Sequence, residues 1–266
     1  MIKKIIKTSE TFQSAHFSLS TLLNKKFAHR GLYGLFQSNQ QKIYVPENSL
    51  NAFSLAIKNN FAIELDIHLL SDQKIIVFHD NNTKRLTNTS IKLKKSTFSE
   101  IQNLTLRSAK TEYQEHIPTL NQVFELVAGR TPLLIELKSE FNVNYQLFCK
   151  KCTQLISGYQ KKYPQAQVAI KSFDPRIIHW FKKNTSITAG LLITSHPKPL
   201  TYFGLAFLHF PFNHWLKPDF LSVDKKIIQK KSIQKFRKSH PVLCWIVKLQ
   251  TKQHYQKYSD NQIFEQ

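Results

Sequence analysis

Cysteine and acidic residues are both scarce in this 266-residue sequence. Three cysteines, Cys149, Cys152 and Cys244, are too few for a disulfide framework. Cys149 and Cys152 have the spacing of a redox motif, but no second pair completes a zinc site, so we interpret them as incidental. Only 17 Asp and Glu oppose 38 Lys and Arg, which gives a net charge of +21. Such a surface favours anionic partners, although solvated helix charge at 225–238 is the simpler explanation for much of the excess.

The sequence also lacks a long apolar run. The first ten residues are basic without a continuous apolar core, so no secretory signal is expected. Residues 199–216 come nearest to a membrane span, but Gly204, His209, Pro211 and Asn213 interrupt them. A cytoplasmic location is therefore expected. The aromatic residues of this segment suit packing on the protein itself, with a weak membrane-surface contact as the alternative.

Strand and helix patterns alternate regularly along most of the chain. Strands are predicted to begin near residues 27, 61, 132, 168, 189, 219, 242 and 262. Capping boxes at Thr97–Glu100 and Thr119–Gln122, and the pair Asp174-Pro175, predict helix starts. Eight such units predict an α/β fold, a (β/α)8 TIM barrel, that occupies residues 1–266 as a single catalytic domain.

The second predicted strand is followed at once by another strand-like run. In residues 61–68 apolar side chains alternate with Glu64, Asp66 and His68, which is the period of a strand. The run at 74–79 follows after too short a link for a parallel crossover, so it is expected to pair antiparallel and to bring His79 roughly opposite Asp66. Residues 71–117 then form a hairpin and cap inserted after the second strand. Residues 32–45 are expected to be a loop.

Three carboxylates are expected to converge at the barrel mouth. In a TIM barrel the active site lies at the carboxyl ends of the strands, where Glu64, Asp66 and Glu136 fall. On one strand alone, such acids usually form a solvated face, but here the same chemistry recurs on several strands. Converging carboxylates repel one another unless a cation lies between them. Oxygen ligands favour a divalent cation of the Mg²⁺ or Ca²⁺ type over zinc.

Basic and imidazole side chains fall at the same end of the predicted barrel. Arg30 and Lys138 are expected to hold phosphate charge, and His29 and His79 form a natural acid–base pair at neutral pH. Together with a metal, this set suits the cleavage of a phosphodiester. His68 is either a hydrogen-bonding support or a packing residue. Glu47 and Asn48 either contact the site or cap a helix.

A series of short motifs extends from Phe27 to the end of the sequence. The motifs are Ala28-His-Arg-Gly31, Pro46-Glu-Asn48, Ile63-Glu-Leu-Asp66, Val77-Phe-His-Asp80, Pro118-Thr-Leu120, Ile135-Glu-Leu-Lys138, Ser172-Phe173, Pro218-Asp-Phe220 and Trp245. In order and spacing this set resembles the glycerophosphodiester phosphodiesterase family, and its bacterial members in particular. Departures at Asp72-Gln73, at Trp245-Ile-Val-Lys248 and at Gln262-Ile-Phe-Glu265 bear on the geometry of the mouth and on substrate preference.

The resemblance implies a fold, a reaction and a set of site residues. It implies a barrel with a cap after the second strand, a Mg²⁺ or Ca²⁺ ion held by the three carboxylates, and proton transfer by the two histidines. Family members cleave glycerophosphodiesters to glycerol 3-phosphate and an alcohol. The glycerol hydroxyl is thought to attack phosphorus, and water then opens the cyclic phosphate. Phe173 and Trp245 would form an apolar wall beside the glycerol.

Two other readings of the same residues stay open. One is a lysophospholipase D, or a phospholipase D-like enzyme, on the same scaffold. The other is a catalytically inactive barrel whose basic surface binds nucleic acid or acidic membrane. Retention of every residue of catalytic type argues against inactivity. The expected partner is therefore a small glycerophosphodiester, with no nucleic acid.

Overall fold

The computed structural model describes residues 19–38, 41–107, 115–140, 143–195 and 216–266. Nearly all of the aromatic segment predicted to pack on the protein or to contact lipid lies outside these residues, and so do the first ten residues. Within the described residues, no helix combines the length and apolar character that crossing a membrane requires.

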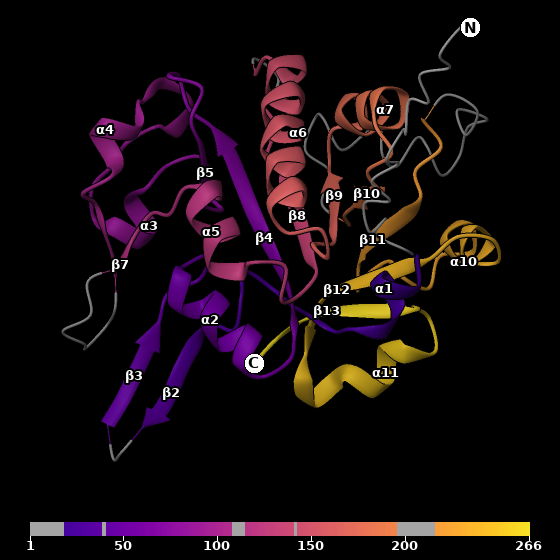
Figure 1. Cartoon of the computed structure of the whole chain (residues 1–266). Coiled ribbons are helices and arrows are strands. Elements are labelled where there is room, and N and C mark those ends of the chain that lie inside the picture. The colour runs from indigo at the N-terminus through magenta and orange to yellow at the C-terminus, as the bar shows by residue number, and fades with distance from the viewer. Residues whose placement is uncertain (1–18, 39–40, 108–114, 141–142, 196–215) are drawn as a thin grey trace, which may run out of the picture.

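Eight parallel strands form a closed barrel at the centre of the molecule (Figure 1). They are β1 (Phe27–Ala28), β4 (Ala62–Leu69), β8 (Leu133–Leu137), β9 (Val168–Ser172), β10 (Ala189–Ile193), β11 (Phe220–Asp224), β12 (Val242–Lys248) and β13 (Asn261–Glu265). Strand β1 pairs with both β4 and β13, which closes the barrel. Each strand begins within one residue of its predicted start. The predicted (β/α)8 barrel is therefore confirmed.

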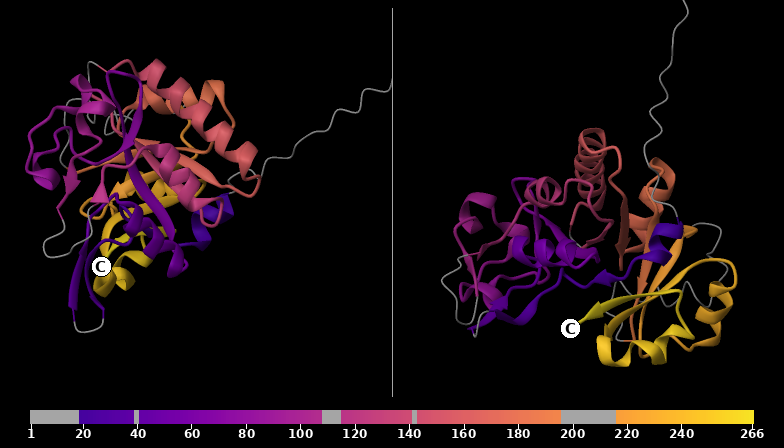
Figure 2. Two further views of the ribbon diagram at one scale, coloured as in Figure 1. Left: turned by 60° about the vertical axis from the view of Figure 1, so that its left-hand side comes forward. Right: turned by 60° about the horizontal axis from the view of Figure 1, so that its bottom comes forward.

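Helices cover the outside of the barrel, and their starts carry the predicted caps. They are α2 (Leu50–Lys58), α5 (Leu120–Val127), α6 (Tyr145–Lys162), α7 (Pro175–Asn184), α10 (Lys231–Arg237) and α11 (Lys252–Gln256), which follows the short η3 (Leu249–Thr251). The Thr119 side chain accepts a hydrogen bond from the Gln122 backbone N–H, and Asp174 accepts one from the Arg176 backbone N–H ahead of α7. Helix α6 packs beside α7 (Figures 1 and 2). The helix predicted between β10 and β11 falls mainly outside the described residues.

The predicted loop at residues 32–45 is wrong, because this stretch contains an antiparallel hairpin. Its strands are β2 (Gly34–Ser38) and β3 (Gln41–Val45). The cross-strand pairs Leu35↔Tyr44 and Phe36↔Ile43 join aliphatic and aromatic side chains. Such pairs stabilise a sheet, and residues 43–45 also favour the extended backbone. The hairpin extends outward near α2 (Figures 1 and 2).

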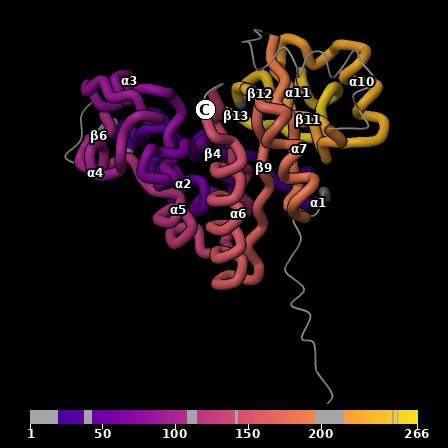
Figure 3. Tube along the Cα trace, turned by 90° about the horizontal axis from the view of Figure 1, so that it is seen from above, coloured from indigo at the N-terminus to yellow at the C-terminus, as the bar shows by residue number. Residues whose placement is uncertain are grey.

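The antiparallel strand β5 (Ile75–Val77) pairs with β4 as predicted. The register places Phe78, not His79, opposite Asp66, since the Phe78 N–H donates to the Asp66 carbonyl at 2.9 Å. After β5 come α3 (Lys84–Thr87), η1 (Leu93–Lys95), α4 (Phe98–Ile101), β6 (Thr105–Leu106) and β7 (Glu115–His116). These elements share a small apolar core of their own, and α3 and α4 lie on the opposite side of the molecule from α10 and α11 (Figures 1 and 3). The division of residues 71–117 as a separate cap stays a prediction.

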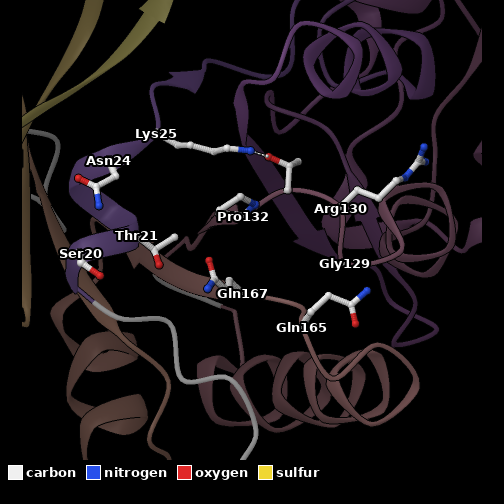
Figure 4. Close-up of a pocket in the computed structure, with 10 residues that line it drawn as sticks. Ser20, Thr21, Asn24, Lys25, Gly129, Arg130, Pro132, Gln165 and Gln167 are labelled. Atoms are coloured by element: carbon white, nitrogen blue, oxygen red, sulfur yellow. Dashed lines mark hydrogen bonds between the residues drawn. The ribbon is translucent and has the colours of Figure 1, made fainter.

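An apolar layer closes the barrel at the amino ends of its strands. It consists of Phe27, Ala62, Leu134, Ala169, Phe220, Leu243 and Ile263, with Leu22 of α1 (Leu19–Asn24) packed against them. The Asn261 side-chain amide donates to the Leu22 carbonyl at 2.6 Å, which ties α1 to β13. A polar hollow of about 340 Å³ lies at this end, between α1 and the residues that precede β8 and β9 (Figure 4). Polar chemistry inside the barrel must therefore lie above this layer, toward the carboxyl ends.

Candidate active site and metal centre

The inward-facing positions directly above the apolar layer are mostly polar. Because side chains two residues apart on a strand share a face, the next inward residue on each strand follows from the layer below. On seven of the strands these are His29, Glu64, Glu136, Lys171, Ser222, Trp245 and Glu265. The sequence therefore places charged groups where the barrel opens, over a base that excludes water.

Glu64, Asp66 and Glu136 form the predicted acidic cluster, here called the triad. Glu64 and Asp66 lie on β4, and Glu136 lies on the neighbouring β8, with Asp66 and Glu136 in register. Each carboxylate offers an oxygen within 4.8 Å of the others, and the three residues are at most 5% exposed. Sequence reasoning thus placed these three residues correctly in one buried cluster.

Two lysine ammonium groups lie between the triad carboxylates. Lys138 Nζ lies 2.6 Å from Glu136 Oε1 and 2.9 Å from Asp66 Oδ1. Lys171 Nζ, on β9, lies 2.8 Å from Glu64 Oε1 and 3.3 Å from Glu136 Oε2. Lys171 is only 2% exposed. Three negative and two positive charges leave the cluster with one net negative charge.

Two residues with unusual backbone conformations support the triad from the β1 side. Arg30 and Asn48 both have φ +55°. This conformation lets the Arg30 backbone N–H donate to Glu64 Oε2 at 3.0 Å. The Asn48 side-chain amide donates to Asp66 Oδ2 at 2.9 Å, and its oxygen accepts from the Asp66 backbone N–H at 3.3 Å. Of the two roles left open for Asn48, the structure shows contact with the site, while Ser49 caps α2.

His29 is held by a carboxylate from the last strand. Its Nδ1 lies 2.8 Å from Glu265 Oε1, which also accepts a hydrogen bond from the Tyr33 hydroxyl at 2.7 Å. The hydrogen bond from His29 lowers the pKa of Glu265 to about 2, although burial opposes this. Because Glu265 is then ionised, the shared proton belongs to His29 Nδ1, and Nε2 is the ring nitrogen that Glu265 does not engage. That Nε2 lies 4.0 Å from Glu64 Oε2.

His79 has the same arrangement with its sequence neighbour. Its Nδ1 lies 2.6 Å from Asp80 Oδ1, and this hydrogen bond, with help from Arg85, holds the pKa of Asp80 below its usual value. The backbone carbonyl of His79 lies 3.2 Å from Nε2 of His68. Burial lowers the pKa of His68 to about 4, so His68 is neutral and donates this hydrogen bond. His68 therefore supports His79, which was one of the two roles left open for it.

The charges within the triad are mutually dependent. Burial by itself would raise the pKa of Asp66, but the charges of Lys138, His79 and Arg30 outweigh it and hold that pKa well below its usual value. The pKa of Glu136 is lowered in the same way, against burial, by Lys138 and Lys171. Burial would lower the pKa of Lys138, yet its carboxylate partners raise it. Asp66 and Glu136 are thus ionised and Lys138 is charged at neutral pH.

Phe173 and Trp245 form an aromatic pair at the same opening. Their ring centroids lie 6.1 Å apart at an interplanar angle of 84°, and both side chains are half-buried. The Trp245 Nε1–H is buried, and no group in the described part of the chain accepts its hydrogen bond. The pair therefore presents an apolar wall with one hydrogen-bond donor.

The family of the protein follows from a comparison with known families. The model of the glycerophosphoryl diester phosphodiesterase family matches residues 29–259. The chain belongs to this family.

Individual relatives match over shorter parts of their length. A glycerophosphodiester phosphodiesterase from Caldanaerobacter subterraneus subsp. tengcongensis is 34% identical over 143 residues, which cover 52% of this chain and 57% of that protein. A lysophospholipase D from Homo sapiens is 29% identical over 150 residues, which cover 53% of this chain and 43% of that protein. The chain thus spans about half the length of these curated relatives.

A solved structure shares the fold over nearly the whole chain. The Oleispira antarctica phosphodiesterase in complex with the product sn-glycerol-3-phosphate has a TM-score of 0.73 at 21% identity. The match covers 92% of this chain and 94% of that chain. At this level of identity, the likeness shows a common barrel.

The triad of this glycerophosphoryl diester phosphodiesterase family member has ligand atoms that suit a hard divalent cation. All three donors are carboxylate oxygens, without sulfur or imidazole nitrogen, and they are buried close together. Mutual repulsion of the carboxylates does not by itself require an ion, because Lys138 and Lys171 already lie between them. The argument for a cation therefore depends on the donor set.

Sequence reasoning overlooked two supporting residues of the site. Lys171 was given no role, and Glu265 was noted only as part of a departure from the family pattern. Alternation along β9 and β13 would have indicated both, since each lies two residues after an apolar inward position. Their partners come from other strands, and a strand pattern does not name those.

Proposed function

We propose that this protein hydrolyses glycerophosphodiesters to glycerol 3-phosphate and an alcohol, in a reaction that depends on a divalent cation and uses His29 and His79 as general acid and base. The observation that supports this best is the convergence of the triad with two imidazoles, each oriented by a carboxylate. Membership of the family supports the same reaction class. The Oleispira antarctica structure holds sn-glycerol-3-phosphate, which is the product expected here.

The two histidines are oriented for proton transfer in the same way, by a hydrogen bond between Nδ1 and a carboxylate. Hydrogen bonds to Glu265 and Asp80 fix the proton on Nδ1, which leaves each Nε2 for exchange with the substrate, and His29 Nε2 lies 4.0 Å from Glu64 Oε2. One Nε2 removes a proton from the glycerol hydroxyl that attacks phosphorus, and the other donates a proton to the alcohol oxygen as its P–O bond breaks. Water then opens the cyclic phosphate with the two roles reversed. The overall balance is one water consumed for each ester bond broken.

The triad and its cations hold the phosphate. A divalent cation, Mg²⁺ or Ca²⁺, bound by the three carboxylates would act as a Lewis acid on a phosphate oxygen. Arg30 and Lys138 lie directly against the triad and supply further positive charge for the remaining oxygens. Phe173 and Trp245 contact the glycerol carbons, and the unpartnered Trp245 N–H is available to a glycerol hydroxyl.

A metal-dependence assay tests the proposal. Release of glycerol 3-phosphate from glycerophosphocholine is measured with Mg²⁺, with Ca²⁺ and after chelation by EDTA. We expect release only with a divalent ion, and loss of release in Glu136→Gln. Glu125→Gln is the matched control, since Glu125 is exposed on the barrel exterior and, among the residues that the structure describes, pairs only with Lys162 and Tyr163. Turnover that survives EDTA, or no turnover with either ion, would contradict the proposal.

A lysophospholipase D activity is the second candidate, favoured by the similarity to the human lysophospholipase D. Under that alternative, lysophosphatidylcholine would be cleaved faster than glycerophosphocholine under identical conditions. The same pair of assays covers the inactive barrel, for which neither substrate would turn over. We also propose that residues 71–117 act as a cap at the mouth, which the separate apolar core of these residues supports.

A further inference from the structure

A polar cavity lies beside His79, outside the triad. Its volume is about 610 Å³, and it is lined by Asp80, three asparagines (Asn81, Asn82 and Asn88) and three cations (Lys84, Arg85 and Arg107). All the lining residues are polar or charged.

A series of alternating charges joins this cavity to the triad. From the triad outward its members are Asp66, Arg30, Glu47, Arg85 and Asp80. The Arg30 guanidinium lies 3.4 Å from Asp66 and 2.8 Å from Glu47, and the Arg85 guanidinium lies 2.6 Å from both Glu47 and Asp80. Such short contacts place the cavity within a few side chains of the phosphate position. The cavity and the catalytic centre are therefore neighbouring parts of one mouth.

The wall of the cavity is held in shape by buried hydroxyl groups. Thr83 is fully buried, and its hydroxyl donates to the Thr89 carbonyl at 2.5 Å and accepts from the Ile91 N–H at 3.1 Å. The Thr87 hydroxyl donates to the Thr83 carbonyl at 3.0 Å. The loop that carries most of the lining residues is therefore ordered before any ligand arrives, which lowers the entropic cost of binding.

The lining charges of the cavity that are not already paired with an opposite charge are positive. Arg85 is neutralised by Glu47 and Asp80. Lys84 and Arg107 are exposed, and within the described residues neither side chain has a carboxylate partner. Two uncommitted cations and no uncommitted anion favour a ligand with negative charge.

We propose that this cavity receives the alcohol portion of the substrate and selects head groups that carry a negative charge. The inference rests on the proposed function, which places the phosphate at the triad and the glycerol against Phe173 and Trp245. The departing alcohol must then lie on the other side of the phosphorus, and we assign it to the cavity beside His79, which the charge series joins to the triad. Lys84 and Arg107 act as specificity residues that attract the head group and take no part in bond breaking.

A series of substrates that differ in head-group charge tests the assignment. Glycerophosphocholine has a cationic head, glycerophosphoglycerol a neutral one, and bis(glycerophospho)glycerol an anionic one. Initial rates of glycerol 3-phosphate release give kcat/KM for the wild type, Lys84→Ala, Arg107→Ala, the double variant, and Lys231→Ala. Lys231 is an exposed lysine on α10, on the opposite side of the molecule (Figure 3).

In the wild type we expect kcat/KM to decrease from the anionic to the neutral to the cationic head group. Each single variant should lower the ratio of anionic to neutral substrate by about 1.5- to 5-fold, as expected for the loss of one exposed charge pair. Lys231→Ala should leave the ratio unchanged, and added salt should reduce it in the wild type. If the wild type and the double variant have equal ratios of kcat/KM for the anionic and the neutral substrate, the inference about the cavity is overturned. Hydrolysis of all three substrates in that experiment would still support the proposed function. If none of the three is hydrolysed, both fail.

Discussion

Replacing Lys171 by methionine tests whether this lysine compensates the negative charge of the triad in the absence of a metal. Lys171 lies 2.8 Å from a Glu64 oxygen and 3.3 Å from a Glu136 oxygen, and it is 2% exposed. Methionine keeps the length and apolar stem of the side chain but removes the charge. A buried carboxylate that loses its partner costs about 3–5 kcal/mol of unfolding free energy. We therefore expect a loss of this size in EDTA, measured by urea unfolding.

Lys182→Met is the matched control for this substitution. Lys182 also forms a short ion pair, 2.5 Å from Asp219, but both side chains are about 30% exposed. Pairs of this kind contribute only about 0–1 kcal/mol. A loss of less than about 1 kcal/mol in Lys171→Met would refute the view that this lysine balances the triad.

A divalent ion should rescue the Lys171→Met variant more than the wild type. Removal of the ammonium group leaves the three carboxylates of the triad with two positive neighbours, Lys138 and Arg30, and takes from Glu64 its only lysine contact within the described residues. Mg²⁺ or Ca²⁺ that binds only the folded protein stabilises it by RT ln(1 + c/Kd), where c is the free ion concentration, so tighter binding gives greater stabilisation. The rise in unfolding midpoint with added ion is therefore expected to be larger in the variant. An equal rise in both proteins would show that Lys171 does not influence ion binding.

Three further predictions concern catalysis, pH and packing. His29→Ala and His79→Ala should each lower kcat by about 10²- to 10⁴-fold with little change in unfolding midpoint, and normal turnover would remove that histidine from its role. Because the pKa of Glu265 is held at about 2 instead of 4.5, its stabilising effect is present above pH 4.5 and lost as the pH falls toward 2. In Glu265→Gln, the free energy of unfolding should therefore change less between pH 4.5 and 2 than in the wild type. Identical curves for the two proteins would contradict this role of Glu265. Gly190→Ala would place a methyl group 2.2 Å from the Phe220 ring, so it should lower the free energy of unfolding by at least about 1–3 kcal/mol. An unchanged midpoint of thermal unfolding would exclude this.

The barrel could be predicted from the sequence because its signals are local. Strand starts follow from short apolar runs, and helix starts follow from capping side chains such as Thr119 and Asp174, whose partners lie two or three residues away. The β2–β3 hairpin was missed because its stability comes from pairs across the two strands, such as Leu35 with Tyr44. A pattern read along one strand does not contain that information.

The candidate site likewise contains residues that local sequence patterns predict and residues whose roles they do not. Glu64, Asp66 and Glu136 could be named because alternation on two strands and the fold rule for barrel mouths place them together. The role of Lys171 could not be named, since its partners lie on β4 and β8 and a lysine within an apolar strand has no local explanation. Pairings of this kind follow only from the register of the folded sheet.

The hydrogen bond between His29, directly after β1, and Glu265, on β13, joins residues 236 positions apart, where these two strands pair and close the barrel. During synthesis, the triad strands leave the ribosome long before β13. An imidazole whose tautomer is set by β13 stays unfixed until that strand has docked. Under the proposed function, catalytic competence would therefore appear only with the last strand in place.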